Sequence, residues 1–416
     1  MNQPVTAGHS GAALAGSAGA PRLRASPPSP GPVPALLLGS GITALGVIRA
    51  LARAGIPALV WTQSTDIARR SRWFRPAPAG SVDPRADLEG YLVGSGLERA
   101  VLFAGSDTWA ERVARMDATL ARRFPGTTAP ATVLDRLLDK ARLAETLEAA
   151  RLPHPRTEPV RSAADVERLD DRLFETAFLK PCDSQRFFQR FGVKAVRVRD
   201  RADAVQRLGE IGRHGLDVVL QEYVPGPPSN HVFIDGFVDA DGRIAALLAR
   251  RRLRMYPPDF GNSTYMVTVA PDEVTGAVAT VKRLVAAVGY RGIFSAELKQ
   301  DARDGVFKLL ETNVRPWWYV DFAARCGVNV CALAYRDALG LPIESIRDYT
   351  VGRSCCYPYY DFYACRELWR RRELSLGAWA RSWAGAEQPV FRWTDPRPAL
   401  TEFGGMLRRK LWGRST

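Results

Sequence analysis

Short apolar runs alternate with stretches of helical periodicity along the first part of the chain. An apolar run of strand length begins at Ala35 and ends in the turn Gly39-Ser40-Gly41, after which apolar residues recur at helical spacing through Leu51. Further strands are predicted at 56–62 and 100–104. The pattern is a βαβ opening with a glycine turn at the carboxyl end of its first strand, where open α/β sheets bind their ligands.

The strand at 100–104 leads through Gly105 into a helix that reaches about Phe124. Two roles are open for Asp107 at the start of this helix. It caps the helix, or it contacts a ligand at the strand-end edge that also carries the first glycine turn. Under the second interpretation, the candidate substrate contacts at this edge are Ser40, Gly41, Ser106 and Asp107.

The glycines of the first turn do not form a dinucleotide fingerprint. Gly39, Gly41 and Gly46 depart from the G-x-G-x-x-G spacing. Trp61-Thr62-Gln63 stands where an acidic ribose partner would follow the second strand. A dinucleotide-dependent enzyme is therefore disfavoured.

After about residue 125 the pattern changes to a strand-rich α+β region. A helix at 132–150 ends before Pro153 and Pro155. The strands predicted after it are 177–181, 195–199, 218–224, 232–238, 244–250, 293–300 and 306–311, with helices near 202–213 and 273–288. We expect four parts: a tail at 1–33, an α/β domain at 34–127, an α+β domain at 128–345 and an extension at 346–416.

The composition is that of a globular protein with a sizeable core. The chain has 416 residues, of which 46% are hydrophobic and 25% are charged. No apolar run is long enough for a transmembrane helix. The tail at 1–33 is rich in Ala, Gly, Ser and Pro and lacks the basic start of a signal peptide, so we expect it to be disordered and the protein to be cytoplasmic.

The charged and sulfur-bearing residues narrow the chemistry further. None of the six cysteines forms a C-x-x-C pair and the four histidines are scattered, which disfavours zinc and favours reduced thiols. The net charge is +14, but only seven of the 58 basic residues are lysines, so a lysine at a strand end is the more informative phosphate contact. No nucleic-acid-binding module is visible, and we expect no nucleic-acid partner.

Oxygen ligands gather on two adjacent predicted strands. Glu311 and Asn313 are two residues apart and share a face, which Glu297 on the neighbouring strand can join. Such a set suits Mg²⁺, with Mn²⁺ as a substitute. Arg315, two residues further on, would hold a substrate carboxylate or a phosphoryl oxygen. The alternative is a solvated strand face that carries ordinary charges.

Two lysines and an extended segment form a second candidate site. Lys180 ends a strand and Lys194 lies beyond the loop that follows, so both can meet a polyphosphate across that loop. The segment 219–226 has the pattern of a strand that leaves through a Pro-Gly turn. Its open backbone can pair with a purine edge, and Glu222 can contact a ribose hydroxyl.

The order of these motifs resembles the ATP-grasp superfamily. The motifs are Leu138-Asp139-Lys140, Leu179-Lys180-Pro181, the segment from Gln221 to Gly226, Glu297, and Glu311-Thr312-Asn313-Val314-Arg315. Within the superfamily the chain is similar to the carboxylate–amine ligases, including the D-aspartate-ligase-like and carbamoyl-phosphate-synthase-like branches. The resemblance spans about residues 35–340 and implies an ATP-grasp fold, of class α/β and α+β, with an N-terminal Rossmann-like pre-ATP-grasp domain.

The resemblance also implies roles for the matching residues around the nucleotide. Lys140 and Lys180 match the lysines that hold the phosphates of ATP. His231 falls near the ribose contacts, with a buried structural role as the alternative. The segment that matches the adenine-pairing main chain consists of Gln221, Glu222, Tyr223 and Val224.

On the metal side, the resemblance assigns Glu297, Glu311 and Asn313 to the magnesium ions that bridge the phosphates. Arg315 matches the arginine that steadies the transferring phosphoryl group and the acyl phosphate. One segment departs from the family. The loop after Lys180 is glycine-rich in typical members, whereas residues 183–191 contain no glycine but three phenylalanines and two arginines. Arginines then cover the ATP, or the lid packs on a bulky or apolar substrate.

The stretch 249–264 is a further candidate for substrate contact. In a strand Arg250 and Arg252 face one way and Arg251 the other, and one of these faces would bind the acceptor or the γ-phosphate. We take Arg251 as the catalytic candidate, with an exposed basic strand as the alternative. Residues 260–264 have the pattern of a loop that closes on substrate.

The function implied is ATP-dependent ligation of a small-molecule carboxylate to an amine, through an acyl phosphate. An alternative from another class is a non-catalytic ATP-binding protein that docks on an anionic membrane or polymer. It draws on the C-terminal extension, which holds Trp369-Arg370-Arg371-Arg372, Trp379, Trp383 and the segment 407–412. The plainer interpretation is that these tryptophans pack the extension onto the core.

Overall fold

A computed structural model of the chain describes residues 32–257 and 261–411, without the side chains of 184–185 and 406–411. The fold reported below is that of the compact unit Val33–Thr416. The tail predicted at 1–33 falls outside the described residues except for its last two positions, and so does Phe260 of the predicted loop. No helix in the described ranges is both long and apolar enough to cross a lipid bilayer.

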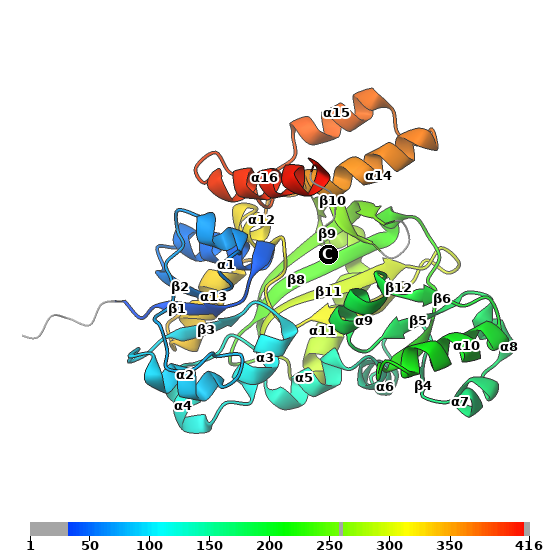
Figure 1. The fold of residues 1–416 in the computed structure, drawn as a ribbon, viewed down its shortest axis with the longest axis horizontal. Coiled ribbons are helices and arrows are strands. Elements are labelled where there is room, and N and C mark those ends of the chain that lie inside the picture. The colour runs from blue at the N-terminus through cyan, green and yellow to red at the C-terminus, as the bar shows by residue number, and fades with distance from the viewer. Residues whose placement is uncertain (1–31, 258–260, 412–416) are drawn as a thin grey trace, which may run out of the picture. The chain divides into compact units, whose positions relative to one another are not determined.

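The first sheet is parallel and three-stranded, in the order β2-β1-β3 (Figure 1). Its strands are β1 (Ala35–Leu38), β2 (Ala58–Trp61) and β3 (Val101–Ala104). Every residue of β1 and β3 is buried, as in other parallel sheets that are covered on both faces. The turns after β1 and β3 touch, because a Cβ atom on Gly39 would lie 2.8 Å from the Cα atom of Gly105.

Helices cover this sheet, and one predicted helix is divided. The elements are α1 (Gly41–Arg53), η1 (Ile67–Arg70), α2 (Leu88–Gly94), α3 (Asp107–Ala114) and α4 (Ala118–Arg123). The single helix predicted from Asp107 to Phe124 is therefore wrong. It breaks because the carboxylate of Asp117 accepts a hydrogen bond from the N–H of Thr119 and caps a new helix.

The helix predicted at 132–150 is divided in the same way. It forms α5 (Ala131–Leu138) and α6 (Lys140–Ala149). Asp139 between them is extended, and its carboxylate accepts the N–H of Arg142 at 2.9 Å. The break places Lys140 at the first position of α6, near the carboxyl end of a strand of the next sheet.

The second sheet is antiparallel and four-stranded, in the order β4-β7-β5-β6. Its strands are β4 (Thr157–Val160), β5 (Ala177–Pro181), β6 (Val196–Arg197) and β7 (Val218–Glu222). The sequence pattern predicts all but β4, an edge strand that contains Pro159 and so lacks a clear strand signal. The helices α7 (Ala163–Glu167), α8 (Asp171–Phe174) and α10 (Arg201–Gly212) share its apolar core.

The loop expected after Lys180 is a helix, α9 (Ser184–Phe191). The N–H of Arg186 donates to the carboxylate of Asp183 at 2.9 Å, which caps the first turn. Phe187 is then buried in the core of the second sheet, while Phe188 is exposed. A glycine-free segment with a capping aspartate loses less entropy in a helix than a glycine-rich loop would.

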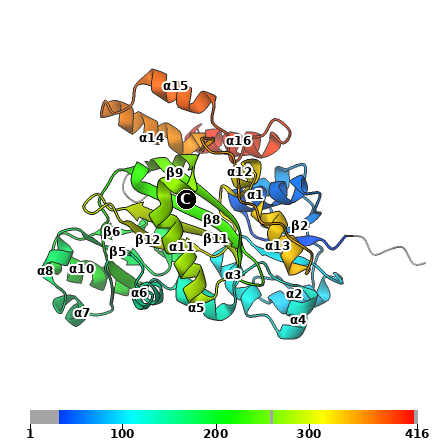
Figure 2. The ribbon, with the colours of Figure 1, turned by 180° about the vertical axis from the view of Figure 1, so that it is seen from behind.

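The third sheet is antiparallel and six-stranded, in the order β12-β11-β8-β9-β10-β13. Its strands are β8 (His231–Val238), β9 (Ile244–Tyr256), β10 (Asn262–Val269), β11 (Gly292–Gln300), β12 (Phe307–Asn313) and β13 (Ser354–Cys356). From Asn262 onward, the predicted loop at 260–264 is instead the start of β10. The helix α11 (Thr275–Val288) packs on β8 and β12, on the side that faces the viewer in Figure 2.

Buried arginines on β9 connect this sheet to its surroundings. Arg250 and Arg252 share a face, as strand alternation predicts, and Arg254 joins them. Each pairs with an acidic residue of a different element, namely Asp235 at 2.6 Å, Glu297 at 3.0 Å and Asp361 at 2.6 Å. An unpaired charge at these depths would be strongly destabilising, so the pairs hold the elements in place.

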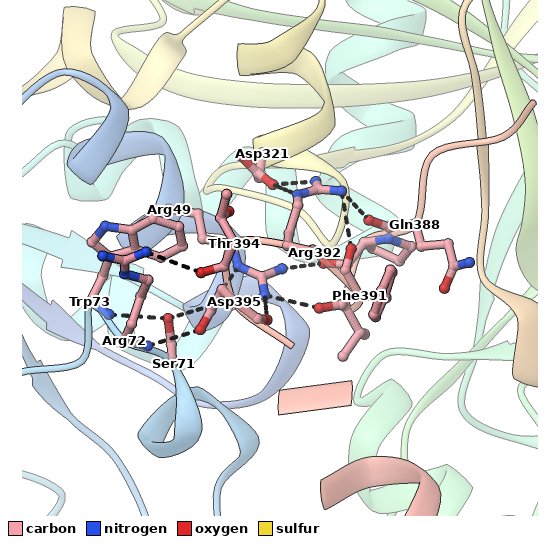
Figure 3. Close-up of polar contacts among 12 residues, drawn as sticks. Arg49, Ser71, Arg72, Trp73, Asp321, Gln388, Phe391, Arg392, Thr394 and Asp395 are labelled. Carbon is pink, nitrogen blue, oxygen red and sulfur yellow. Dashed lines mark hydrogen bonds and ion pairs between the residues drawn. The ribbon is translucent and has the colours of Figure 1, made fainter. Parts of the chain in front are cut away.

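The C-terminal part is helical. Its elements are α12 (Val320–Arg325), α13 (Val330–Ala338), α14 (Pro358–Arg370), α15 (Leu376–Ala384) and α16 (Arg397–Leu411). The helices α12 and α13 pack against α1, and α14 packs against β9. Between α15 and α16, Arg392 pairs with Asp321 at the start of α12 (Figure 3).

Asp395 is the main anchor of this C-terminal part (Figure 3). Its buried carboxylate lies 2.9 Å from the guanidinium of Arg49 on α1. It also accepts hydrogen bonds from the hydroxyl of Ser71 and the N–H of Arg72, at 2.7 and 2.9 Å. Arg49 donates in addition to the carbonyl of Val390 at 2.9 Å. The segment before α16 is therefore fastened to the first sheet and its helices.

We expect Asp395→Ala to lower the free energy of unfolding by about 3–5 kcal/mol, because Arg49 would stay charged and buried without its carboxylate. Urea denaturation followed by circular dichroism would measure the change. Asp83→Ala is the matched control, since Asp83 pairs with Arg85 in an exposed salt bridge and its loss should hardly move the midpoint. Equal losses in both variants would contradict the anchoring role.

Candidate active site

A cavity of about 230 Å³ lies between the four-stranded and the six-stranded sheets. Its walls come from β5 and β7 on one side and from β8, β9, β11 and β12 on the other. The candidate residues that line it are Lys180, Lys194, Gln221, Glu222, Tyr223, Val224, His231, Glu297 and Glu311. The fold thus brings most of the residues expected at the phosphates, the purine and the metal to one place, whereas Lys140 and Asn313 do not line the cavity.

Lys180, on β5, extends across the cavity toward β12. Its ammonium donates to the carbonyl of Leu310 at 3.2 Å and lies 3.5 Å from the side-chain oxygen of Gln221. Burial lowers the pKa of Lys180, and the nearby carboxylate of Glu311 opposes this effect. Gln221 is fixed in turn by a hydrogen bond from its amide nitrogen to the hydroxyl of Thr157 at 2.9 Å.

The two other lysines approach from different elements. Lys194 lines the cavity and donates to the side-chain oxygen of Asn262 at the start of β10, and burial lowers its pKa. Lys140 is not part of the lining. Its ammonium donates to the carbonyl of Cys182 at 3.3 Å, just beyond the end of β5, and its charge contributes to the lowered pKa of Lys180.

The two glutamates lie opposite each other on paired strands, with Glu297 of β11 in register with Glu311 of β12. Glu297 accepts a hydrogen bond from His231 at 2.8 Å and pairs with Arg252 at 3.0 Å. Burial alone would raise the pKa of Glu297, but Arg252, His231 and Lys180 outweigh it and hold the pKa well below its usual range. Glu297 is therefore ionised at neutral pH.

His231 orients this carboxylate. Burial, with the charge of Arg252 as the second cause, lowers the pKa of His231 to about 4. The ring is neutral at pH 7, and we assign its proton to Nδ1 because the carboxylate of Glu297 can only accept. His231 thus has a buried structural role, one of the two roles that the sequence left open. Its ring also lines the cavity.

Glu311 is the uncommitted acid of the pair, since no described residue forms a hydrogen bond or ion pair with its carboxylate. Two residues on, the side-chain oxygen of Asn313 accepts a hydrogen bond from Arg315 at 3.3 Å. Two carboxylates and an amide oxygen suit Mg²⁺, which completes its shell with phosphate oxygens and water. Among the described residues, no group of three or more His, Cys, Asp or Glu side chains is arranged to hold a metal ion.

Arg315 lies just beyond β12 and reaches the first sheet. Its Nε and one Nη donate to the two carboxylate oxygens of Asp107, at 2.9 and 3.3 Å. The hydroxyl of Ser106 accepts the N–H of Trp109 and caps α3. The capping role considered for Asp107 therefore belongs to Ser106, and Asp107 pairs with Arg315 beyond the end of β12 instead.

The backbone donor of the first glycine turn is hydrogen-bonded within the protein. The N–H of Gly41 donates to the carboxylate of Asp66 at 2.6 Å. Gly41 has a φ of +70°, a left-handed conformation that glycine adopts without strain. Ser40 is exposed and makes no capping hydrogen bond. Asp66 therefore satisfies the N–H donor of Gly41, and the predicted substrate contact of Gly41 stays a prediction that this donor does not support.

Arg252, and not Arg251, faces the cavity. Arg251 lies on the opposite face of β9, where its guanidinium donates to the carbonyl of Ser229 at 3.1 Å. The choice of Arg251 is corrected accordingly. Strand alternation separates the two faces, but only the packing of the sheet shows which of them turns inward.

The segment expected at the purine offers one open donor. The N–H groups of Glu222 and Tyr223 donate to neighbouring backbone carbonyls, whereas that of Val224 has no acceptor among the described residues. The carboxylate of Glu222, expected at the ribose, pairs with Arg303 and lies 3.8 Å from Lys308. A ribose hydroxyl would have to share it with these cations.

Four lining residues lie outside both the candidate residues and the candidate stretch 249–264: Phe178, Ala195, Lys299 and Leu310. Phe178 precedes Lys180 by two residues and Lys299 follows Glu297 by two, so the strand period identifies both. Leu310 carries no such signal. A bulge between β11 and β12 leaves Leu310 unpaired beside Glu311, and both line the cavity.

Comparison with known proteins gives matches in sequence and in structure. The chain is 26% identical to D-aspartate ligase from Enterococcus faecium over an alignment of 250 residues. This alignment covers 58% of this chain and 59% of the ligase. Biotin carboxylase from Campylobacter jejuni, solved as a complex with β-γ-ATP, has a TM-score of 0.61 at 14% identity and covers 77% of this chain and 74% of its own. L-amino acid ligase from Bacillus licheniformis has a TM-score of 0.58 at 18% identity, and the match covers 77% of this chain and 78% of the ligase. No protein-family model matches the sequence.

These similarities confirm the expected fold class. The chain has the ATP-grasp fold, with mixed α/β and α+β content and a Rossmann-like sheet at its start. The sequence similarity to D-aspartate ligase also confirms the resemblance to the carboxylate–amine ligases that the ordered motifs indicate. The match spans 59% of the length of the D-aspartate ligase.

We expect Arg252→Ala to lower the free energy of unfolding by about 2 kcal/mol, because Glu297 would keep only His231 as a partner. Arg251→Ala should cost less than about 1 kcal/mol, since Arg251 makes a single hydrogen bond to a backbone carbonyl. Urea unfolding of both variants tests the difference, and Arg252→Lys should recover part of the loss by keeping the charge. A larger effect at Arg251 would reverse the assignment of the two faces.

Proposed function

We propose that this protein is an ATP-dependent ligase that activates a carboxylate as an acyl phosphate and joins it to an amine. The observation that carries the proposal is the single cavity in which Lys180 and Lys194 accompany Glu297 and Glu311. Cations for a polyphosphate and acids for its metal ion are what phosphoryl transfer requires. The similarity to D-aspartate ligase supports the same class of reaction.

The nucleotide would occupy this cavity. Lys140, Lys180 and Lys194 would contact the phosphates as point charges. The open N–H of Val224 is the donor that a purine edge requires, and Phe178 is an apolar surface for the ring. Support also comes from the biotin carboxylase of the same fold, which was solved with bound β-γ-ATP.

The metal ion would be Mg²⁺, held by Glu297, Glu311 and Asn313, with Mn²⁺ as a substitute. When bound, it would neutralise phosphate charge and polarise the γ-phosphoryl group. Glu297 is kept ionised and fixed by His231 and Arg252, whereas Glu311 is open to the cavity. One acid is thus preorganised, and the other is available to a ligand.

The reaction would proceed in two displacements. A carboxylate oxygen attacks the γ-phosphorus of ATP, the bond to ADP breaks, and an acyl phosphate forms. The amine nitrogen then attacks the acyl carbon and loses a proton, and inorganic phosphate leaves as the amide bond forms. Negative charge develops on phosphoryl oxygens in the first step, and Lys180, Lys194 and Arg315 are the groups that would stabilise it.

The carboxylate substrate would bind where Arg315 meets Asp107, between the first sheet and β12. The Gly41 amide is engaged within the protein, and the carboxylate of Asp107 holds Arg315. We therefore propose that Asp107 positions Arg315, and that the hydroxyl groups of Ser40 and Ser106 donate to the substrate from this side. In this arrangement residues 34–127 form the wall against which the substrate binds. Residues 128–345 form the nucleotide and metal site, and residues 346–416 are an extension of this domain.

The partners would be a small-molecule carboxylate and an amine, with no nucleic acid. A cytoplasmic setting is supported by the use of ATP and by six cysteines that are all free thiols. We also propose that the basic, Trp-rich C-terminal extension touches an anionic membrane peripherally. The non-catalytic alternative gains no support from the similar proteins, which include two ligases.

We expect the wild-type protein to release ADP from Mg-ATP only when pooled carboxylates, D-aspartate among them, and pooled amines are both present. Glu311→Gln should reduce this rate by at least about tenfold, since an amide is a poorer metal ligand than a carboxylate. Glu158→Gln, at an acid of β4 outside the cavity, is the matched control. Wild-type rates in Glu311→Gln would exclude the proposed metal site.

Lys180→Ala should raise the dissociation constant of Mg-ATP by about 10- to 100-fold, the effect of losing one charge-assisted phosphate contact. Isothermal titration calorimetry would measure it without any acceptor substrate. Lys282→Ala serves as the comparison, since Lys282 is exposed on α11 and away from the cavity. An unchanged affinity in Lys180→Ala would move the phosphate site elsewhere.

A further inference from the structure

The helix α14 carries its apolar side outward. Its buried positions include a charged residue, Asp361, together with Ala364 and Cys365. Its exposed positions follow one another at helical spacing and are Tyr359, Phe362, Tyr363, Arg366, Trp369 and Arg370. We call these six residues the aromatic–arginine face. A surface helix usually shows the opposite distribution, so this face requires an explanation.

Buried polar contacts prevent α14 from turning its aromatic side inward. The carboxylate of Asp361 pairs with Arg254 of β9 at 2.6 Å and accepts hydrogen bonds from Thr264 and Trp383, each at 2.7 Å. Rotation of the helix would break all three contacts and leave a buried charge without a partner. The outward orientation of the face is thus enforced by the core.

The neighbouring helix extends the same surface. No residue of α15 is buried, and Leu376 at its start is 59% exposed. The ring of Trp379 lies 5.6 Å from that of Phe362, which is itself 45% exposed. In both Figure 1 and Figure 2, α14 and α15 extend away from the sheets, and the side chains of this face stay exposed among the described residues.

The charge of the face is uncompensated. Neither Arg366 nor Arg370 has a hydrogen-bond or ion-pair partner among the described residues. The nearest acid on the helix, Glu367, pairs with Arg371 at 2.9 Å on another side. Four aromatic rings are therefore combined with two free guanidinium groups and no acid, a combination that complements a partner with both apolar and anionic parts.

We propose that the aromatic–arginine face docks on an anionic phospholipid bilayer. Tyrosine and tryptophan side chains favour the interface between headgroups and acyl chains, and arginines there meet the lipid phosphates. The proposal goes beyond the ligase activity, because it assigns the expected membrane contact to one helix face and needs no catalysis to be tested.

Two other occupants fit the face less well. A second copy bound about a two-fold axis would bring Arg366 and Arg370 of both chains together without any acid between them. Single-stranded nucleic acid could stack on the aromatic rings, but the exposed aliphatic side chain of Leu376 on the neighbouring helix α15 offers a base no stacking surface. A bilayer accommodates both aromatic and aliphatic groups.

The full-length protein would be sedimented with vesicles of phosphatidylcholine that contain about 30% phosphatidylglycerol, and with vesicles of phosphatidylcholine alone. We expect binding to the anionic vesicles only. Arg366→Glu combined with Arg370→Glu should weaken it by about tenfold or more. Trp369→Ala should weaken it also at high salt, where charge is screened and the apolar contribution remains.

Arg168→Glu combined with Arg172→Glu is the matched control. These arginines are exposed near α7 and α8, far from α14 in both views, and the change of charge is identical. Unchanged melting temperature and Mg-ATP affinity in all variants would show that the fold and the nucleotide site are intact. Absence of vesicle binding, equal losses in both double variants, displacement by a single-stranded oligonucleotide, or self-association through this face would each overturn the proposal.

Discussion

Three arginines buried on one strand require three carboxylates, and the rest of the structure is arranged around that requirement. Arg250, Arg252 and Arg254 lie on the inner face of β9, where an uncompensated charge would cost several kcal/mol. Their partners come from three different elements, namely Asp235 of β8, Glu297 of β11 and Asp361 of α14. One strand therefore joins the sheet, the candidate active site and the C-terminal helices through a single kind of interaction.

Within the site, the same pairing divides the acids into two kinds. Glu297 is held by Arg252 and His231 and stays ionised, so its position does not depend on a ligand. Glu311 on the paired strand has no such commitment and faces the buried ammonium of Lys180. A fixed acid beside an available one is a suitable arrangement for a metal ion that arrives with a polyphosphate, because little reorganisation is needed when both bind.

At the other end of β9, the pairing of Arg254 with Asp361 determines how the C-terminal extension lies. It fixes the buried side of α14, and Asp395 fastens the following segment to Arg49 of α1. Trp383 donates to Asp361, a hydrogen bond within the extension that supports the carboxylate paired with Arg254 and does not itself pack a tryptophan on the core. Trp369 does not take part in such packing either. It remains 48% exposed beside the other aromatic residues of α14.

The sequence by itself determines most strands, the shared face of Glu311 and Asn313, and the ATP-grasp resemblance, because these depend on residues a few positions apart and on their order. It does not show that β9 turns Arg252 inward, that the bulge at Leu310 adds a residue to the cavity wall, or that Asp66 occupies the Gly41 amide. Each of these is a contact between segments that are distant in sequence. Only the tertiary structure decides which charges are buried together, since the energy of a buried charge depends on the partners that folding brings to it.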